Sequence, residues 1–280
     1  MRVGVLGATG RMGQATCTAV LGAGDLELTG AAGRSAAGGE LRAHVGGAPA
    51  GLVVGDLNSL LDAGLDAGLD VVVDFSNPEA TMTAARALLP AGTHLVSGTT
   101  GLSDAAFDEL RRLAEGDGGN AVWAPNFALG AVLGMHFATI AARWYPAAEV
   151  IELHHDRKVD APSGTALRTA RKIAAARGAD GAPNAAPGAA RGVASSAPSG
   201  EASPARGQDV DTVRVHAVRL PGLVAHQEVI FGGAGEVLTI RHDSLDRASF
   251  MPGVLLAVRA VASRPGLTLG LEPLLGLDRG

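Results

Sequence analysis

The stretch Arg2-Val-Gly-Val-Leu-Gly7-Ala-Thr-Gly10-Arg-Met-Gly13 decides the fold of the first part of the chain. A short apolar run is followed by regularly spaced glycines and then by an Ala-, Val- and Leu-rich stretch with helical spacing that extends to about Ala23. A strand, a glycine turn and a helix in this order predict a dinucleotide-binding unit. Gly7 permits the tight turn, Gly10 lets the backbone approach a pyrophosphate, and Gly13 lets the helix pack on the strand. A turn whose glycines serve only packing is the alternative.

Further apolar runs alternate with stretches of helical spacing. We expect strands at 26–31, 52–54, 71–73, 95–97 and 121–124, and helices near 57–65, 78–90 and 103–115. This alternation predicts an α/β fold with a Rossmann-type, doubly wound parallel sheet that is covered by helices on both faces. In such sheets, ligands bind beyond the carboxyl ends of the strands.

Small and polar residues follow three of these strands, at Asp74-Phe75-Ser76, Gly98-Thr99-Thr100 and Pro125-Asn126-Phe127. Small side chains allow a ligand to approach closely, and the amide of Asn126 can hold a carboxamide or a hydroxyl group. Alternatively, these residues only form ordinary turns between strands and helices, and Phe75 is as readily expected to pack in the core as to contact a ligand.

The choice of nucleotide is expected about 20 residues beyond the last glycine, where an acidic side chain binds the adenosine ribose of NAD. Gly33 and Arg34 occupy this place, after the strand at 26–31. Without a carboxylate nothing repels a 2′-phosphate, and Arg34 could pair with it. We therefore expect NADPH to be used at least as well as NADH.

Chemistry-bearing side chains gather in the stretch Glu152-Leu-His-His-Asp-Arg-Lys-Val-Asp-Ala-Pro-Ser-Gly-Thr-Ala-Leu167. An apolar run ends in two histidines, and a loop then leads to Ser163 and a segment with helical spacing. Because serine is a favoured N-cap residue, the N–H groups of Gly164 and Thr165 should point outward at the positive end of the helix dipole. The stretch therefore predicts an anion site.

Lys158 and the imidazoles of His154 and His155 are close to this helix start in the sequence. Each of these groups supplies a donor or positive charge, which predicts a ligand with more than one carboxylate. Asp156 and Asp160 complicate this prediction, but both can face solvent. A lysine close to other cations is also a good proton donor, because cationic neighbours lower its pKa. A structural or merely exposed position at the end of a strand is the alternative for each histidine.

This stretch resembles the signature of the dihydrodipicolinate reductase (4-hydroxy-tetrahydrodipicolinate reductase) family, particularly its actinobacterial members. The resemblance covers nearly the whole chain except 34–56 and 177–207, and recurs at Gly7 to Gly13, Asp74-Phe-Ser-Asn-Pro-Glu79, Ser97-Gly-Thr-Thr-Gly101, Ala124-Pro-Asn-Phe127 and Arg241-His-Asp-Ser-Leu-Asp-Arg247. It implies that NADPH or NADH reduces a cyclic, unsaturated dicarboxylate derived from 4-hydroxy-tetrahydrodipicolinate to tetrahydrodipicolinate, in the diaminopimelate route to lysine.

The resemblance also implies roles for single residues. His154 would be a proton donor or relay and Lys158 the principal acid, while the substrate carboxylates would be held by His155, Ser163, Gly164 and Thr165. The cofactor contacts that we expect are at Gly7, Ala8, Thr9, Gly10, Arg11, Met12, Arg34, Gly98, Thr99, Thr100, Ala124, Pro125, Asn126 and Phe127. The family commonly has an acidic residue at or near position 33, and this chain departs from that pattern.

The second half of the chain predicts an α+β domain with an open, mixed or antiparallel sheet. A helix is expected at 129–143 and strands at 148–153, 211–220, 225–231 and 237–242, with the last two joined in a hairpin across 232–235. Residues 177–207 are mostly Ala, Gly, Pro and Ser with almost no large apolar side chain, which predicts a flexible loop. In the family, the helix at 250–261 packs on the first domain, and the open sheet is covered by assembly into tetramers.

With 280 residues the chain has room for about two domains. We expect residues 1–127 and 244–280 to form a discontinuous dinucleotide-binding domain, and residues 128–243 to bind substrate and to mediate assembly into a homotetramer. A hinge between the domains should let them close over the substrate.

Composition excludes several function classes. The net charge of −5 argues against nucleic-acid and membrane-surface partners. The one cysteine, Cys17, excludes an internal disulfide and fits a reducing cytoplasm. The chain starts directly with a strand pattern and has no apolar run near the ~18 residues of a membrane span, so we expect a cytoplasmic protein. His216, His226 and His242 lack partners at ligand spacing, and we assign no metal.

Two alternatives from other classes stay open. One is a related two-domain enzyme that acts on another amino-acid precursor, such as an aspartate or homoserine dehydrogenase. The other is a catalytically silent nucleotide-binding sensor, although His154, Lys158 and the turn at 162–165 argue against it.

Overall fold

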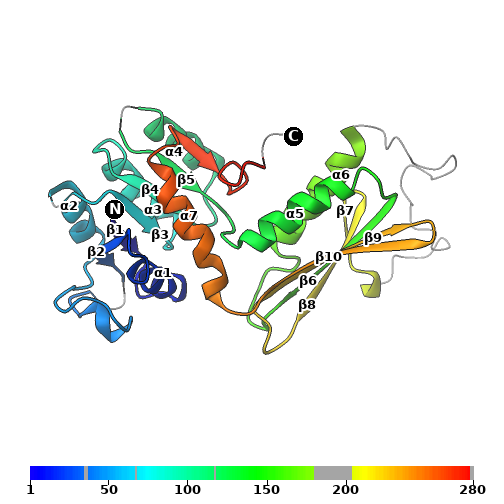
Figure 1. Cartoon of the computed structure of the whole chain (residues 1–280), viewed down its shortest axis with the longest axis horizontal. Helices are drawn as coiled ribbons and strands as arrows, with labels where there is room; N and C mark the ends of the chain where they lie inside the picture. Colours follow the sequence, from blue (N-terminus) through cyan, green and yellow to red (C-terminus); the bar gives the residue numbers. More distant parts are fainter. Residues whose placement is uncertain (35–36, 67, 117, 180–203, 278–280) are drawn as a thin grey trace. The chain divides into compact units, whose positions relative to one another are not determined.

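The computed structural model describes residues 1–34, 37–66, 68–116, 118–179 and 204–277. These residues form two compact units (Figure 1). Unit 1 comprises Met1–Leu129 and Arg247–Gly280, and unit 2 comprises Gly130–Asp246. Unit 1 is therefore built from two stretches that are far apart in the sequence.

Unit 1 contains a parallel sheet with the strand order β11-β5-β4-β3-β1-β2. Its strands are β1 (Arg2–Leu6), β2 (Glu27–Ala32), β3 (Val71–Asp74), β4 (His94–Ser97), β5 (Ala121–Trp123) and β11 (Leu267–Leu269). The central strand β3 is buried along its whole length, as expected of a sheet with helices on both faces. The predicted Rossmann-type α/β fold is confirmed.

The helices of unit 1 are α1 (Arg11–Leu21), α2 (Leu57–Asp66), α3 (Pro78–Leu88), α4 (Asp104–Ala114) and α7 (Met251–Val261), with short 3₁₀ turns η1 (Leu41–Ala43) and η3 (Arg247–Phe250). Local sequence explains two of the helix starts, because Asn77 and Ser103 accept capping hydrogen bonds from Ala80 and Ala106. Helices α2, α3 and α4 lie in a row on one face of the sheet, while α1 and α7 pack together on the other (Figure 1).

The strand expected at 52–54 is not formed, and this prediction was wrong. Val53 makes a single bridge with Glu40, and the Val54 N–H donates to the carbonyl oxygen of Gly39 at 2.8 Å. The segment thus bonds mainly to the loop before it, because an apolar run this short, flanked by Gly51 and Gly55, supports no ladder along β2.

Unit 2 contains a mixed sheet with the strand order β10-β9-β6-β8-β7. Its strands are β6 (Ala147–His154), β7 (Gln208–Val210), β8 (Val213–Arg219), β9 (Ala225–Gly233) and β10 (Glu236–Ser244). Strands β6 and β8 are parallel and the other neighbours are antiparallel. The predicted hairpin is confirmed, since Gly233 pairs with Glu236 across a turn in which Gly235 has φ +81°.

Helices α5 (Leu129–Ala141) and α6 (Gly164–Ala179) supply the apolar cover of this sheet. Ala138 of α5 and Ile173 of α6 share a buried cluster with Val150 and Phe231. Helix α6 extends to Ala179, so the loop predicted at 177–207 was placed too early, and 180–203 lie outside the described residues. Within the described part of the chain, no helix is long and apolar enough to cross a membrane.

Candidate active site

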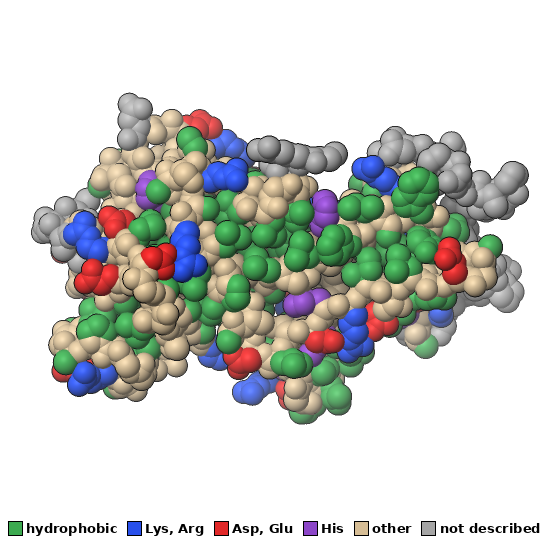
Figure 2. All heavy atoms as spheres, viewed as in Figure 1, with side chains coloured by type: hydrophobic (Ala, Val, Ile, Leu, Met, Phe, Trp, Pro, Cys, Tyr) green, Lys and Arg blue, Asp and Glu red, His purple; other side chains and the backbone are tan. Residues whose placement is uncertain are grey.

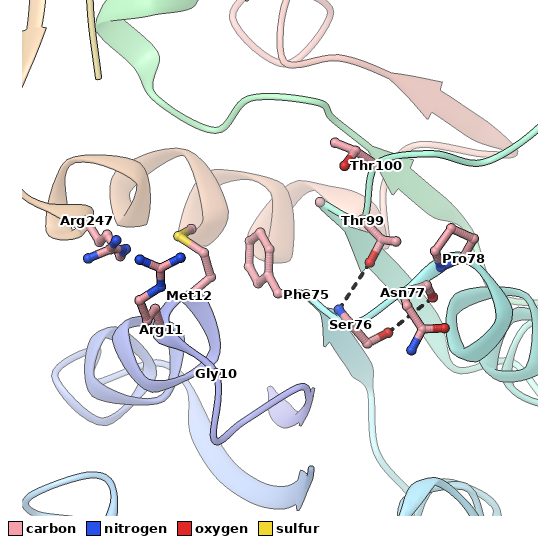
Figure 3. A pocket seen from close by; sticks show the side chains of 11 residues that line it. Gly10, Arg11, Met12, Phe75, Ser76, Asn77, Pro78, Thr99, Thr100 and Arg247 are labelled. Carbon is pink, nitrogen blue, oxygen red and sulfur yellow. Dashed lines mark hydrogen bonds between the residues drawn. The ribbon is translucent and has the colours of Figure 1, made fainter. Parts of the chain in front are cut away.

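A cavity of about 390 Å³ lies at the carboxyl ends of β1, β3 and β4 in unit 1 (Figure 3). This is the edge at which parallel sheets bind ligands. The cavity brings together six of the predicted cofactor residues, Gly10, Arg11, Met12, Gly98, Thr99 and Thr100, with five residues that were not assigned to the site, Phe75, Ser76, Asn77, Pro78 and Arg247.

The glycine turn shapes one wall of this cavity. Gly7 has φ +86°, and a Cβ atom there would lie 2.6 Å from the carbonyl oxygen of Phe75. A Cβ atom on Gly13 would overlap the carbonyl oxygen of Gly7, so α1 can pack this closely on β1 only with glycine. Gly10 is the N-cap of α1, whose first turn contains no acidic side chain.

Two guanidinium groups make this wall positive. Arg11 is the first residue of α1, and Arg247 comes from η3, far along the chain. Figure 3 shows both side chains beside Met12 at the same end of the cavity. A helix N-terminus with two guanidinium groups and no acid in its first turn fits the pyrophosphate of a dinucleotide.

The opposite wall is held together by a buried carboxylate, Asp74, at the end of β3. It accepts hydrogen bonds from the hydroxyl groups of Thr81 at 2.6 Å, Ser97 at 2.7 Å and Thr99 at 2.9 Å, and from the hydroxyl and the N–H of Ser76. The Ser76 N–H also donates to Thr99 Oγ1 at 3.1 Å (Figure 3). Asp74 thereby fixes the loops after β3 and β4 against each other.

Aromatic packing explains why the loop after β4 contains a glycine. Phe75 and Phe127 pack edge to face with their ring centroids 5.7 Å apart, and a Cβ atom on Gly98 would overlap the ring of Phe75. The indole N–H of Trp123 donates to the carbonyl oxygen of Thr99 at 2.8 Å and holds this loop from the other side.

The other eight predicted cofactor residues are outside the lining of this cavity. Ala8, Ala124 and Phe127 are buried, whereas Pro125 is exposed and the Asn126 Oδ1 accepts a hydrogen bond from the Ala128 N–H at 2.9 Å. Gly7, Thr9 and Arg34 complete the set. Arg34 is exposed in the turn after β2, and the Thr9 side chain lies against Gly33.

In unit 2, two of the predicted site residues, His154 and Ser163, bond to a fully buried carboxylate, Glu152. Arg219 of β8 donates to it twice, from Nη1 to Oε2 at 2.9 Å and from Nη2 to Oε1 at 2.8 Å. The Nδ1 atom of His154 is hydrogen-bonded to Oε2, and the Ser163 N–H donates to Oε1 at 3.0 Å. Burial acts to raise the pKa of Glu152, but the hydrogen bonds of His154 and Arg219 outweigh it and hold the pKa below its ordinary value.

The start of α6 is close to this carboxylate. The Ser163 hydroxyl accepts the N–H of Ala166 at 3.2 Å, which is the predicted N-cap interaction. Ser163 is buried, whereas Gly164 is exposed with open space where a Cβ atom would be. Gly164 and the half-buried Thr165 therefore form the accessible part of this helix start.

The ammonium group of Lys158 is paired with an acid of its own loop. Its ammonium group donates to both carboxylate oxygens of Asp160, at 2.7 and 2.8 Å, although the Asp160 side chain is 61% exposed. This hydrogen bond lowers the pKa of Asp160. The two residues are close enough in sequence that one short loop lets a solvent-facing acid reach the ammonium group.

Comparison with known proteins identifies the family. The model described as "Dihydrodipicolinate reductase, N-terminus" matches residues 1–127, and the one described as "Dihydrodipicolinate reductase, C-terminus" matches residues 130–275. The chain belongs to the dihydrodipicolinate reductase family.

Similar members of this reductase family come from actinobacteria. The 4-hydroxy-tetrahydrodipicolinate reductase of Nocardia farcinica is 50% identical over 278 residues, which cover 99% of either chain. The enzyme of the same name from Mycolicibacterium vanbaalenii is 49% identical over 280 residues, covering 99% of this chain and all of the relative.

A solved structure of the same reductase family has the same fold. The dipicolinate-bound dihydrodipicolinate reductase from Paenisporosarcina sp. TG-14 is 36% identical, with a TM-score of 0.80 over 98% of each chain. An amine dehydrogenase from Mycobacterium smegmatis, at 16% identity and a TM-score of 0.62 over 96% of this chain and 94% of its own, shares the fold alone. The alternatives of another amino-acid dehydrogenase or a silent sensor are therefore not favoured.

Two of the three strand histidines, His216 and His226, pair with acids. His216 Nε2 is 2.7 Å from Glu149, and His226 Nδ1 is 2.7 Å from Asp243. Among the residues that the structure describes, no group of three or more His, Cys, Asp or Glu side chains could hold a metal ion. Cys17 is buried in α1, and burial raises the pKa of its thiol to about 12.

Proposed function

We propose that this chain reduces 4-hydroxy-tetrahydrodipicolinate, by way of dihydrodipicolinate, to tetrahydrodipicolinate in the diaminopimelate route to lysine, with NADPH or NADH as the cofactor. Relatives with the corresponding enzyme name match it over nearly their full length. The single observation that carries the proposal is that one carboxylate, Glu152, binds both His154 and the start of α6. A proton-carrying imidazole therefore lies beside an anion-binding helix start.

The substrate carboxylates are bound in unit 2 by His155, Ser163, Gly164 and Thr165. Gly164 and Thr165 are accessible at the start of α6, where N–H groups and the helix dipole favour anions. Ser163 contributes mainly by capping the helix, since its hydroxyl already accepts the Ala166 N–H. A dicarboxylate is bound in the related Paenisporosarcina structure, which supports this class of ligand.

The proton is supplied by Lys158 with His154. The side chain of Lys158 is 23% exposed and that of its partner Asp160 is 61% exposed, so the acid can be solvated when the pair opens. A substrate carboxylate can therefore replace Asp160 as the partner of the ammonium group at little cost. A positioned general acid accelerates a reaction by about 10² to 10⁴.

The cofactor is bound by unit 1. The start of α1 with Arg11 and Arg247 holds the pyrophosphate, and the loop at 98–100 holds the nicotinamide and its ribose. The family resemblance adds residues 124–127 to the nicotinamide site, although they are outside the lining of the cavity. The bound, reduced nicotinamide supplies the hydride. Gly33 and Arg34 lie at the adenosine end, and with no carboxylate at position 33 NADPH is used at least as well as NADH.

The two units have separate tasks in this proposal, with residues 1–127 and 244–280 binding the dinucleotide and residues 128–243 binding the substrate. The enzyme is cytoplasmic and assembles into a homotetramer through unit 2. Exposed apolar side chains on this unit support the assembly, namely Phe137, Ile140, Trp144 and Val237. Figure 2 shows hydrophobic side chains gathered along α5 and the strands beside it. Light scattering at several protein concentrations tests the tetramer.

An absorbance assay tests the activity. Substrate generated by the preceding synthase should cause oxidation of NADPH that depends on this protein. Parallel assays with NADP⁺ and an amino acid or an amino alcohol would detect a dehydrogenase of another specificity. Oxidation in those assays alone would contradict the proposed substrate.

A further inference from the structure

We propose that Glu152 is a positioning residue that fixes His154 in the tautomer with hydrogen on Nδ1 and also holds the start of α6 and the loop of Lys158. This inference rests on the proposed function, because it concerns how His154 and the helix start are prepared for their roles. Glu152 does not touch the substrate in this account and acts through the groups that it binds.

Four donors satisfy both oxygens of this buried carboxylate. Oε1 accepts from Arg219 Nη2 and the Ser163 N–H, and Oε2 accepts from Arg219 Nη1 and is bonded to His154 Nδ1. Burying an ionised carboxylate is costly unless its charge and its lone pairs are matched. Arg219 supplies the opposite charge and cannot lose its proton at ordinary pH. Glu152 is therefore ionised in the folded protein.

The ionised state determines the tautomer of His154. An ionised carboxylate only accepts hydrogen bonds, so the hydrogen between Glu152 and His154 belongs to Nδ1 of the ring. In the neutral imidazole the lone pair is then on Nε2, and in the imidazolium Nε2 carries the second hydrogen. His154 consequently takes up and releases its proton through Nε2 alone.

The same carboxylate reaches the other parts of the site. Its bond to the Ser163 N–H anchors the residue that caps α6. Arg219 Nη2 also donates to the carbonyl oxygen of Asp160 at 2.6 Å, and the Asp160 side chain holds Lys158. Glu152 thus orders the imidazole directly, and the backbone of the Lys158 loop through Arg219.

NMR of the histidine side chains measures the tautomer of His154 directly, without an activity assay. In protein labelled with ¹⁵N-histidine, the signals of His154 are identified because they disappear in the variant His154→Gln. We expect the neutral ring of His154 to carry hydrogen on Nδ1 and none on Nε2. A neutral ring with hydrogen on Nε2 would overturn the proposal. In Glu152→Gln the amide can donate as well as accept, so the population should move toward the tautomer with hydrogen on Nε2.

Kinetics separate positioning from folding. Loss of the correct tautomer in a catalytic triad costs about 10⁴ in kcat, and for Glu152→Gln we expect a loss of about 10² to 10⁴. The affinity for NADPH, which unit 1 binds, should be unchanged. Near-normal kcat, or a shift of KM alone, would contradict the role. If Glu152→Gln does not fold, the NMR tautomer of the unsubstituted protein decides.

The chain contains a matched control on the same strand. Glu149 of β6 also binds a histidine and an arginine, with His216 Nε2 at 2.7 Å and Arg206 Nη2 at 2.6 Å, but none of the three is a predicted site residue. Glu149→Gln should leave kcat and the His154 tautomer unchanged. If the unsubstituted protein does not reduce the proposed substrate, the proposed function is wrong. The NMR measurement still tests the His154 tautomer independently of that result.

Discussion

A Cβ atom built on Gly33 would lie 2.6 Å from the hydroxyl oxygen of Thr9. Thr9 belongs to the glycine turn at the start of α1, and Gly33 directly follows β2. The space that a side chain at position 33 needs is therefore already taken by the turn. We therefore expect the side chain of residue 9 to limit whether an acidic residue at position 33 can select NADH.

An acidic residue introduced at position 33 should shift the cofactor preference toward NADH only when residue 9 is small. We expect Thr9→Ala/Gly33→Asp to weaken NADPH relative to NADH by about tenfold to a hundredfold, since hydrogen bonds to charged groups contribute about 1.5–3 kcal/mol. Gly33→Asp alone should bind both nucleotides poorly because its side chain meets Thr9. KM values for both nucleotides check this, and an efficient switch by Gly33→Asp alone would show that Thr9 imposes no limit.

The side chain of Arg34 should favour NADPH over NADH, which is opposite to the effect of an acid at position 33. Arg34→Ala removes the cation expected to pair with a 2′-phosphate, so KM for NADPH should rise about tenfold or more while KM for NADH stays unchanged. Arg42→Ala is the control, because Arg42 is a nearby exposed arginine that pairs with Glu40. An equal rise in KM for both nucleotides would show that Arg34 does not discriminate between NADPH and NADH.

Lys158→Ala should lose kcat and leave cofactor binding intact. The expected loss is about 10² to 10⁴, the contribution of one general acid, and the NADPH dissociation constant should not change. Asp160→Asn serves as the comparison, because it removes the charge that Lys158 holds in the free protein and should retain most of the activity. Near-normal turnover of Lys158→Ala would remove this residue from the mechanism.

Asp74 should matter for both stability and cofactor affinity. Asp74→Ala leaves buried hydroxyl groups without their acceptor, and we expect a loss of about 3–5 kcal/mol in the free energy of unfolding with weaker NADPH binding. Asp70→Ala, just before the other end of β3, removes a partly exposed partner of Arg2 and should cost about 1 kcal/mol. Denaturant unfolding measures both, and equal losses would contradict the role of Asp74.

Local signals in the sequence were enough for most of the fold. The strand β3 is an uninterrupted Val-Val-Val run, and the turn of the β9–β10 hairpin needs only a glycine at a positive φ. Strands β7 and β11, each three residues long, were not predicted. Leu267 joins the sheet by pairing with Ala121, and no local pattern in either segment reveals such a distant partner.

The candidate site was only partly visible in the sequence for the same reason. Arg247 lines the cavity of unit 1 because the chain returns to this unit after unit 2, and the spacing of Arg247 and Arg11 alone does not reveal this return. The sequence alone predicted no role for Glu152, because its partner Arg219 is distant in the chain. The signal that could have identified it is an acid inside an otherwise apolar strand run, because such a residue must be paired.

The most direct test of the central claim is the consumption of NADPH when purified protein meets synthase-generated 4-hydroxy-tetrahydrodipicolinate. The account predicts rapid loss of the reduced-nicotinamide absorbance, with tetrahydrodipicolinate as the product, and almost none with a His154→Ala/Lys158→Ala variant that still binds NADPH. A folded, NADPH-binding protein that leaves this substrate unreduced would contradict the account.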